Sequence, residues 1–553
     1  MNSFIYELLH FETLKHNLMK PLSFVFGLLF LNSLNAQTLR PDSSFAEVGR
    51  IITTNEVELV GIYDVEIAAD GSAYLIGTGE RFTDDSLVIY LALGKLDVSG
   101  NLDNQFGNNG IVHTEHPAGQ LYLGESWTQK DGKLLLAGHT FDMYTYEFLS
   151  IVQRYNPNGS LDLTFGNQGT FTEDDEEFNL SGQVFELPSG KIMLTATKWL
   201  DDGRDACSLI QLNIDGTKDQ SFGNDGVVVI EYPDFEYSVK NYDAAFQADG
   251  KIIIAGHLGG AEGESDFMML RVLENGSLDD SFGDNGFFIS DLGNFDAIHH
   301  VTLQKDGKIL FTGGAINADF ESITNLLIAG RLNNDGTLDK TFGENGMINF
   351  DDYQSQNPLG YQIKVTPDDN LMLGGSVYNF EDLNNQKADI FLMRMNKDGV
   401  VDKSFGNNGI FIDDFDAYFD NLYGMKFDSS GRILVYGESI SPGFEGPRGF
   451  IARYIPDLSL GKFELNDINS SVLTYPNPIA NECTIKYDLL KETKVSIDLV
   501  NVNGNLIKTF VNQDVKSSGS NQESISMEGL TPGIYLIRIK TELGSTTVKV
   551  IKQ

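Results

Sequence analysis

Two oxygen-rich loops offer the first candidate residues for chemistry in this sequence. Segments 333–344 and 396–407 begin Asn-x-Asp-Gly-x-x-Asp, the spacing with which the first half of a calcium loop supplies oxygen ligands. The twelfth position, where a bidentate carboxylate is expected, is glutamate in the first segment but asparagine in the second. The competing interpretation, which we favour, is that Asn, Asp and Gly form turns here. The candidate calcium ligands are Asn333, Asp335, Asp339 and Glu344, and no other cofactor is predicted.

The eight histidines form no constellation typical of a catalytic or metal site. His139 and His257 occupy equivalent positions of two repeats, and the adjacent His299 and His300 would point to opposite faces of a strand. The chain has no Gly-x-Ser-x-Gly elbow, phosphate-binding loop or zinc-protease helix motif. We therefore predict no catalytic residues and a protein that is not an enzyme. A role of carboxylate pairs in glycoside hydrolysis is left as an alternative, because a chain with 79 acidic residues always contains such pairs.

The composition indicates a strongly acidic all-β protein. Acidic residues outnumber basic ones by 79 to 39, and the formal net charge is −40. Such a field repels DNA, RNA and anionic lipid, which argues against nucleic-acid partners. The 57 glycines and 37 phenylalanines indicate many tight turns and aromatic packing points. The two cysteines, Cys207 and Cys483, exclude a disulfide framework and a cysteine-rich zinc site.

The N-terminal region contains one apolar run, at residues 22–31, preceded by Lys15 and Lys20. This run is too short to span a bilayer but matches the h-region of a secretory signal. We predict a signal peptide over residues 1–36, with Met19 as an alternative start, and no transmembrane segment after cleavage. The chain is therefore predicted to leave the cytoplasm through the periplasm.

Residues 37–456 repeat themselves at a period near 60. The block Leu-Asp-x-x-Phe-Gly-x-x-Gly recurs in seven copies, of which the first is degenerate and some others replace the leucine. A second block, Asp-Gly-Lys followed by an apolar run and Ala-Gly or Thr-Gly, recurs in step, with some looser copies. The phenylalanines of the first block are Phe45, Phe106, Phe165, Phe222, Phe282, Phe342 and Phe405.

Each repeat is predicted to hold four antiparallel strands, a to d. Strand a follows the Phe-Gly turn (227–231), strand b precedes the Asp-Gly turn (242–247), strand c is the apolar run after it, and strand d ends the repeat (327–332). Glycine supplies the positive φ of a primed turn between b and c. The pattern predicts an all-β, seven-bladed β-propeller, with each phenylalanine packed between blades. An open β-solenoid is the rival fold, and the mode of ring closure stays open.

The paired blocks resemble the bacterial delta-60 repeat over about three-quarters of the chain. That resemblance implies a surface or secreted protein of propeller-like architecture. It implies no particular reaction or ligand.

A separate module follows a predicted linker at residues 457–472. Short alternating strands with glycine turns over residues 473–553 predict a small β-sandwich. Its motif residues are Tyr475, Pro476, Asn477, Pro478, Gly533, Tyr535, Lys549 and Lys552. With these motifs the module resembles the type A sorting domain of the type IX secretion system. That resemblance implies a Bacteroidetes-type bacterium, recognition by the secretion machinery, and release or attachment at the outer-membrane surface. An ordinary adhesive sandwich domain is the alternative.

One rim of the propeller is the predicted binding surface. The strand order places the variable, acidic and aromatic a–b and c–d connections on one rim and the uniform turns on the other, and loops on a rigid scaffold tend to carry binding residues. This rim would suit a basic partner, cations, or a glycan stacked on tyrosines; the competing interpretation is that acidic loops are merely solvated. The candidates are Asp174, Asp175, Glu176, Tyr232, Asp234, Tyr237, Asp413, Asp414, Asp416 and Tyr418.

Taken together, these patterns predict an exported, non-enzymatic binding or structural module whose partner is an unidentified extracellular glycan or protein. A propeller hydrolase or lyase acting on extracellular polysaccharide is one alternative. A calcium-dependent adhesin is another.

Overall fold

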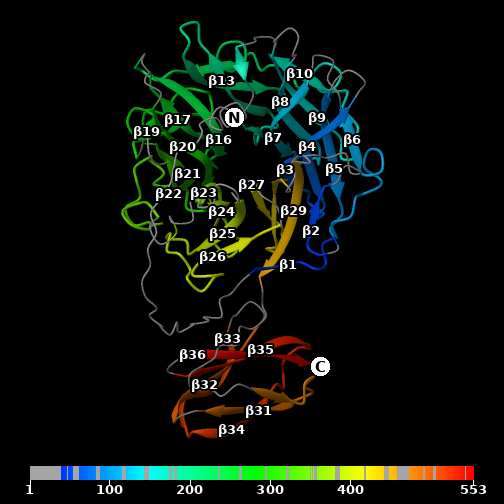
Figure 1. Cartoon of the computed structure of the whole chain (residues 1–553), viewed down its shortest axis with the longest axis vertical. Helices are drawn as coiled ribbons and strands as arrows, with labels where there is room; N and C mark the ends of the chain where they lie inside the picture. The colour runs from blue at the N-terminus through cyan, green and yellow to red at the C-terminus, as the bar shows by residue number, and fades with distance from the viewer. Residues whose placement is uncertain are drawn as a thin grey trace, which may run out of the picture. The chain divides into compact units, whose positions relative to one another are not determined.

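The computed structural model describes two β-rich regions of the chain, and every described element is a strand (Figure 1). The predicted signal peptide and the predicted linker up to residue 471 lie outside the described residues. No described helix is long and apolar enough to cross a membrane. The described residues are 39–46, 48–53, 61–82, 87–114, 120–141, 148–173, 177–179, 183–234, 237–260, 264–292, 295–318, 323–348, 350, 353, 358–379, 387–415, 419–440, 447–456, 472–489, 492–501, 506–541 and 544–553.

Antiparallel groups of strands in residues 39–456 are arranged around a ring, which confirms the β-propeller fold (Figure 1). Each group is given from its innermost strand outward. The groups of the first half of the ring are β3 (Gly61–Ile67), β4 (Ala73–Phe82), β5 (Leu87–Leu96) and β6 (Ile111–Thr114); β7 (Gln120–Thr128), β8 (Leu134–Phe141), β9 (Phe148–Tyr155) and β10 (Thr170–Glu173); and β11 (Phe178–Asn179) with β12 (Val184–Glu186), β13 (Ile192–Trp199), β14 (Asp205–Leu212) and β15 (Val227–Ile230). They are followed by β16 (Ser238–Phe246), β17 (Ile252–Gly259), β18 (Ser265–Val272) and β19 (Phe287–Ser290); β20 (Phe295–Leu303), β21 (Ile309–Ala318) and β22 (Ile323–Leu332); β23 (Pro358–Val365), β24 (Leu371–Asn379), β25 (Lys387–Met395) and β26 (Ile410–Asp413); and β27 (Phe419–Phe427), β28 (Ile433–Ile440) and β29 (Pro447–Pro456).

Each sequence repeat straddles two of these groups. The predicted strand a is the outermost strand of the preceding group: β15, for example, pairs with β14. The expectation that strands a to d of one repeat form one blade is therefore wrong, because the tight Phe-Gly turn folds strand a back onto the strand d before it.

The same offset explains how the ring closes. The N-terminal strands β1 (Leu39–Pro41) and β2 (Arg50–Ile52) both pair antiparallel with β29, the last strand of the propeller. The first repeat thus supplies the outer strand of the last group, and pairing between chain-distant strands joins the two ends of the ring.

Buried phenylalanines and arginines hold neighbouring groups together. The phenylalanines of the first block are almost fully buried, as predicted. Phe282 packs against Gly336 of the next turn, where a Cβ would lie 2.8 Å from the ring. An arginine also lies over the Phe282 ring: the guanidinium of Arg271 is 4.8 Å from its centroid, and Arg331 lies 4.5 Å from the Phe342 centroid in the same way. Equivalent arginines bind the aspartate of the block, in the pairs Arg154–Asp162, Arg271–Asp279, Arg331–Asp339, Arg394–Asp402 and Arg453–Asp42.

The Asp-Gly hairpins differ from the predicted primed turns. In the turn before β17, the Gly250 amide donates to the Gln247 carbonyl, and the Gln247 amide donates to the Lys251 carbonyl. Only Gly250 has a positive φ, +89°. This is the three-residue loop with a glycine bulge. The prediction of a two-residue primed turn is therefore wrong, whereas the predicted requirement for glycine is correct.

Residues 473–553 form the predicted β-sandwich. One sheet has the order β30 (Leu473–Tyr475), β31 (Glu482–Leu489) and β34 (Gly519–Ser526). The other has the order β33 (Leu506–Lys516), β32 (Thr493–Val500), β35 (Gly533–Thr541) and β36 (Gly544–Lys552). Apolar side chains of both sheets, such as Ile485 and Ile537, share one buried core.

Candidate functional site

The candidate calcium loop has structural roles in the propeller. The Asp335 carboxylate accepts hydrogen bonds from the amide and hydroxyl of Thr337, and Asp339 accepts from Lys308 and Arg331. Burial raises the pKa of Asp339, but hydrogen bonds from Lys308 and Thr341 outweigh it and hold that pKa well below its usual value. In the part of the chain that the structure describes, Asp335, Asp339 and Glu344 do not converge on a common point. The amide of Asn333 donates to Thr337, as expected of a turn.

The predicted rim residues fall in separate connections. Tyr232, Asp234 and Tyr237 lie together around a hollow of about 530 Å³ that Asp266 also lines. The Tyr232 ring packs edge-on against Tyr237 and Phe287. Asp413 ends β26 and accepts a hydrogen bond from the Tyr454 hydroxyl. Asp174, Asp175, Glu176, Asp416 and Tyr418 lie outside the described residues, so the rim as a whole stays a prediction.

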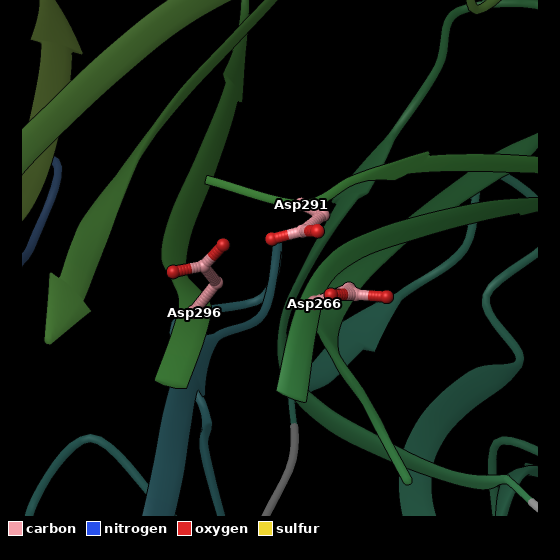
Figure 2. A group of neighbouring side chains, drawn as sticks. All are labelled: Asp266, Asp291 and Asp296. Atoms are coloured by element: carbon pink, nitrogen blue, oxygen red, sulfur yellow. The ribbon is translucent and has the colours of Figure 1, made fainter. Parts of the chain in front are cut away.

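Two groups of three aspartates lie on this rim at repeat-equivalent positions. One is Asp266, Asp291 and Asp296, whose side chains Figure 2 shows close together; Asp266 and Asp296 are the second residues of β18 and β20. The other is Asp389, Asp414 and Asp420. Single parallel bridges, Ser265 to Phe295 and Ala388 to Phe419, bring two members of each group together.

Local structure accounts for much of each aspartate group. Asp296 accepts a hydrogen bond from the Leu292 amide, and Asp420 accepts one from the Phe415 amide, so each fixes the connection between two groups of strands. Burial raises the pKa of Asp420 to about 6, and burial together with Asp291 raises that of Asp266. Three carboxyl oxygens within 4.8 Å of one another would repel if all were ionised, which a raised pKa relieves.

The sorting-domain motifs stabilise the last strand of the sandwich. The Asn477 side chain donates to the Lys549 carbonyl and accepts from the Ile551 amide, so the Tyr-Pro-Asn-Pro segment binds β36 through its asparagine. The Tyr535 hydroxyl donates to the Thr531 carbonyl, which lies two residues before β35 begins at Gly533. Tyr475 and Lys549 remain largely exposed at the sandwich surface.

A β-bulge recurs near the middle of the innermost propeller strands. In β3, β16, β20, β23 and β27 the register with the next strand skips one residue, and in β7 it skips two. A bulge re-aims the side chains of its strand, and these strands surround the propeller axis (Figure 1). The skipped residues are Tyr63, Tyr242, His299, Tyr361 and Tyr423, here called the aromatic belt, and, in β7, Gly124 and Glu125.

Rings of the aromatic belt contact one another from strand to strand. Tyr63 stacks on Tyr423 with centroids 5.8 Å apart, and His299 stacks on Tyr361 at 5.9 Å. Tyr242 meets His299 edge-on. The belt keeps contact with solvent, since Tyr63 is 41% exposed.

Charged and titratable side chains lie one to three residues after the bulges of five of these strands, and Glu125 lies inside the bulge of β7. We call this set the axial cluster: Asp64, Glu66, Glu125, Asp243, His300, Lys364 and Lys426. Its members make contacts between different groups of strands. Asp64 accepts hydrogen bonds from Ser126 at 2.5 Å and from the Tyr436 hydroxyl at 2.8 Å. Lys426 binds Glu66 at 2.8 Å.

The other side of the axial cluster combines an acid, a histidine and a lysine. Asp243 accepts from the Val301 amide at 2.7 Å and lies 3.8 Å from His300 Nε2. The same Nε2 lies 2.8 Å from Lys364 Nζ, which donates to it. The bulge breaks the strand alternation at this point, so His299 and His300, expected on opposite faces, both contact residues of β23.

The axial cluster shifts the pKa values of its members strongly. Burial, followed by Asp64 and Asp243, raises the pKa of Glu125 well above its usual range. Burial raises that of Asp243 to about 6 and, together with Lys426, lowers that of Lys364. Burial and Lys364 lower the pKa of His300 well below its usual value, which keeps this ring neutral. Buried groups with strongly shifted pKa values concentrate at functional sites, and the axis is therefore the strongest candidate site in the described residues.

Sequence reasoning missed this site, although a signal for it exists. Asp64, Glu125, Asp243 and His300 each precede the aspartate of the Asp-Gly turn by six residues. A polar residue at a constant offset inside an otherwise apolar inner strand is the pattern that could have revealed the axis.

Two family models match parts of the chain. The secretion system C-terminal sorting domain matches residues 473–553. A β-propeller domain of unknown function, DUF5122, matches residues 129–165, 247–282 and 304–342. The chain is thus a β-propeller with a type IX secretion sorting domain, and it is exported to a secreted or surface-attached state. No curated protein matches it in sequence.

Solved propeller structures resemble the fold at low identity. A protein of unknown function from Dyadobacter fermentans is 11% identical, with 74% of this chain and 97% of that chain covered and a TM-score of 0.38. A polysaccharide lyase described as an ulvan lyase of family PL25 is 12% identical, with coverage of 72% and 95% and a TM-score of 0.39. The β-propeller domain of the trilobed protease from Pyrococcus furiosus is 9% identical, with coverage of 67% and 92% and a TM-score of 0.33. Likenesses of this size carry no argument about activity.

Proposed function

Starting from an exported β-propeller with a type IX sorting domain, we propose that this protein is an extracellular binding protein whose ligand site lies at the propeller axis. One observation carries the proposal: the recurrent bulges bring an aromatic belt and the axial cluster together at the axis. Aromatic faces beside hydrogen-bonding charged groups are typical of sites for polar organic ligands. In this proposal the sorting domain directs export of the protein, and the propeller binds the ligand.

The test is a binding screen of the purified protein against arrayed glycans, amines and peptides. The axial variant is Glu125→Gln, which keeps the side-chain shape and removes the charge. The matched rim variant is Asp234→Asn. A ligand whose binding falls in the axial variant and persists in the rim variant supports the axis as the site. Loss of binding in the rim variant alone would place the site on the rim and refute the proposal.

A second candidate function is a polysaccharide hydrolase or lyase. The observation that favours it is the pairing, in one cluster, of a carboxyl group of raised pKa, Glu125, with an amine of lowered pKa, Lys364. General acid–base catalysis near neutral pH uses a carboxyl group with a raised pKa together with a basic group with a lowered pKa. The assay measures reducing ends and unsaturated uronate absorbance released from acidic and neutral polysaccharides. Turnover that is lost in Glu125→Gln would support an enzyme; product at the level of a blank would exclude one for the polysaccharides tried.

A further inference from the structure

The group of Asp389, Asp414 and Asp420 lies where two neighbouring strand groups of the ring meet. Asp389 is the third residue of β25, and Asp420 is the second residue of β27. The parallel bridge between Ala388 and Phe419 brings these two strands together. Asp414 directly follows β26, in the connection that leads to β27. A carboxylate oxygen of each aspartate lies within 4.8 Å of one from each of the other two, so acids from three elements converge on one small volume.

Two buried carboxylate oxygens of this group lack a donor. Asp420 is 0% exposed, and its Oδ2 accepts a hydrogen bond from the Phe415 amide at 2.9 Å. Its Oδ1 is buried as well and has no hydrogen-bond partner among the described residues, and the same is true of Oδ1 of Asp389. Buried polar atoms in folded proteins are almost always paired, and an orphaned one indicates a bound water or ion that completes the site. These two oxygens therefore point to a ligand that the described residues do not supply.

The protein itself compensates little of the negative charge in this group. Ser439 contributes only a neutral hydroxyl beside Asp420. Lys387 Nζ lies 3.8 Å from Asp414 Oδ2, but these side chains are 39% and 43% exposed, and ion pairs in solvent contribute little. A proton compensates only in acid, because burial raises the pKa of Asp420 to about 6. A water molecule could donate to one orphaned oxygen but would leave three acids uncompensated at neutral pH, whereas a bound cation satisfies both needs.

The ligand chemistry fits calcium. Calcium prefers carboxylate and other oxygen ligands and accepts irregular sets of six to eight of them at about 2.3–2.6 Å. Two oxygens 4.8 Å apart can both lie about 2.4 Å from one ion, whereas magnesium requires about 2.0–2.1 Å and near-octahedral geometry. All three side chains are aspartates, which argues against zinc and copper, since these metals favour imidazole and thiolate. The exposed Asp414 leaves one side of the group open, so water can complete the coordination.

We propose that Asp389, Asp414 and Asp420 bind a calcium ion that links two neighbouring strand groups of the propeller. The buried carboxylates of Asp389 and Asp420 hold the ion from the protein side, and Asp414 closes the site toward solvent. The repeat-equivalent group in Figure 2 shows the same convergence of three carboxylate oxygens. This calcium site is separate from the proposed ligand site at the propeller axis, so neither proposal depends on the other.

The experiment is isothermal titration of the whole protein with calcium chloride near neutral pH, after treatment with EDTA and its removal. We expect a dissociation constant of about 10⁻⁴–10⁻³ M, the range of extracellular calcium modules. In Asp414→Asn, which changes the exposed member of the group, we expect the number of ions bound to fall by one. Asp420→Asn keeps an acceptor for the Phe415 amide and should show the same loss. The control variant Asp280→Asn, which changes an exposed aspartate elsewhere, should bind as wild type.

Hydrogen–deuterium exchange of the same samples locates the ion. Calcium should slow exchange at residues 412–415 and 419–422 in wild type, because the ion fixes both strands and the connection between them. This protection should be lost in Asp414→Asn and kept in Asp280→Asn. Magnesium chloride at the same concentration should give much weaker protection, which separates calcium binding from the effect of ionic strength.

Several results would overturn the proposal. Full calcium binding in both Asp414→Asn and Asp420→Asn would place the ion elsewhere, and loss of binding in Asp335→Asn alone would assign it to the loop of residues 333–344. Absence of calcium binding by the wild-type protein would leave the orphaned oxygens to water and remove the site. Equal protection by magnesium would overturn the choice of calcium.

Discussion

The ring closure can be tested at Arg453, which joins the last strand group to the N-terminal strands. The residue is 2% exposed, its side chain donates to Asp42 at 2.8 Å and to the Val98 carbonyl at 2.6 Å, and its guanidinium covers the Phe45 ring. Removing one partner of a buried ion pair costs about 3–5 kcal/mol. With an unfolding entropy of roughly 2 cal/mol/K per residue, a domain of this size should lose roughly 3–6 °C in melting temperature in Arg453→Ala.

Arg331→Ala is the matched control, because Arg331 forms the equivalent pair with Asp339 inside the ring. Both variants should be destabilised by a similar amount in urea unfolding. Only Arg453→Ala should also speed hydrogen exchange of residues 50–52, whose strand pairs with β29 across the closure. Slow exchange of these amides in Arg453→Ala, or equally fast exchange in Arg331→Ala, would refute closure through the N-terminal strands.

Three further changes test the packing, the rim and the sorting domain. Gly336→Ala should destabilise the propeller by about 1–3 kcal/mol in urea unfolding, because Gly336 has a φ of +82° and its Cβ would lie 2.6 Å from the Gly283 amide nitrogen; wild-type stability would contradict this packing. Asp420 has a pKa raised to about 6, so the folded state binds a proton between about pH 4 and 6 and the unfolding free energy should fall as pH rises through that range, by up to about 3 kcal/mol. Asp420→Asn should flatten this slope relative to the control variant Asp280→Asn, which changes an exposed aspartate, and an unchanged slope would speak against a raised pKa at this site. Asn477→Ala should weaken the attachment of β36 by about 1 kcal/mol, seen as faster amide exchange at Ile551, because it removes two hydrogen bonds; unchanged exchange would show that the motif does not hold this strand.

The propeller was predictable because its determinants are local and repeated. The phenylalanine, glycine and Asp-Gly positions each dictate a turn or a contact between neighbouring groups, so seven noisy copies reinforce one pattern. The assignment of strand a to its own blade was wrong because the Phe-Gly turn determines which strand it pairs with. The boundary of a sequence repeat gives no information about that pairing.

The axial cluster was harder to find for a physical reason. Its residues come from different strand groups. The bulges beside them change the alternation of apolar and polar residues in the sequence only by one or two extra residues. Asp64 and Ser126 are 62 positions apart yet share a hydrogen bond. By contrast, the turn hydrogen bonds of Asn333 and Asp335 join residues only a few positions apart, so the sequence alone could predict them.

Hydrogen–deuterium exchange of the whole protein, with and without a saturating concentration of the ligand that the binding screen selects, tests the axial site most directly. We expect slower exchange in the innermost strands around their bulges, at residues 61–67, 120–128 and 238–246, and no change in the rim segments 231–234 and 289–292. Protection confined to those rim segments, with the innermost strands unaffected, would contradict a binding site at the propeller axis.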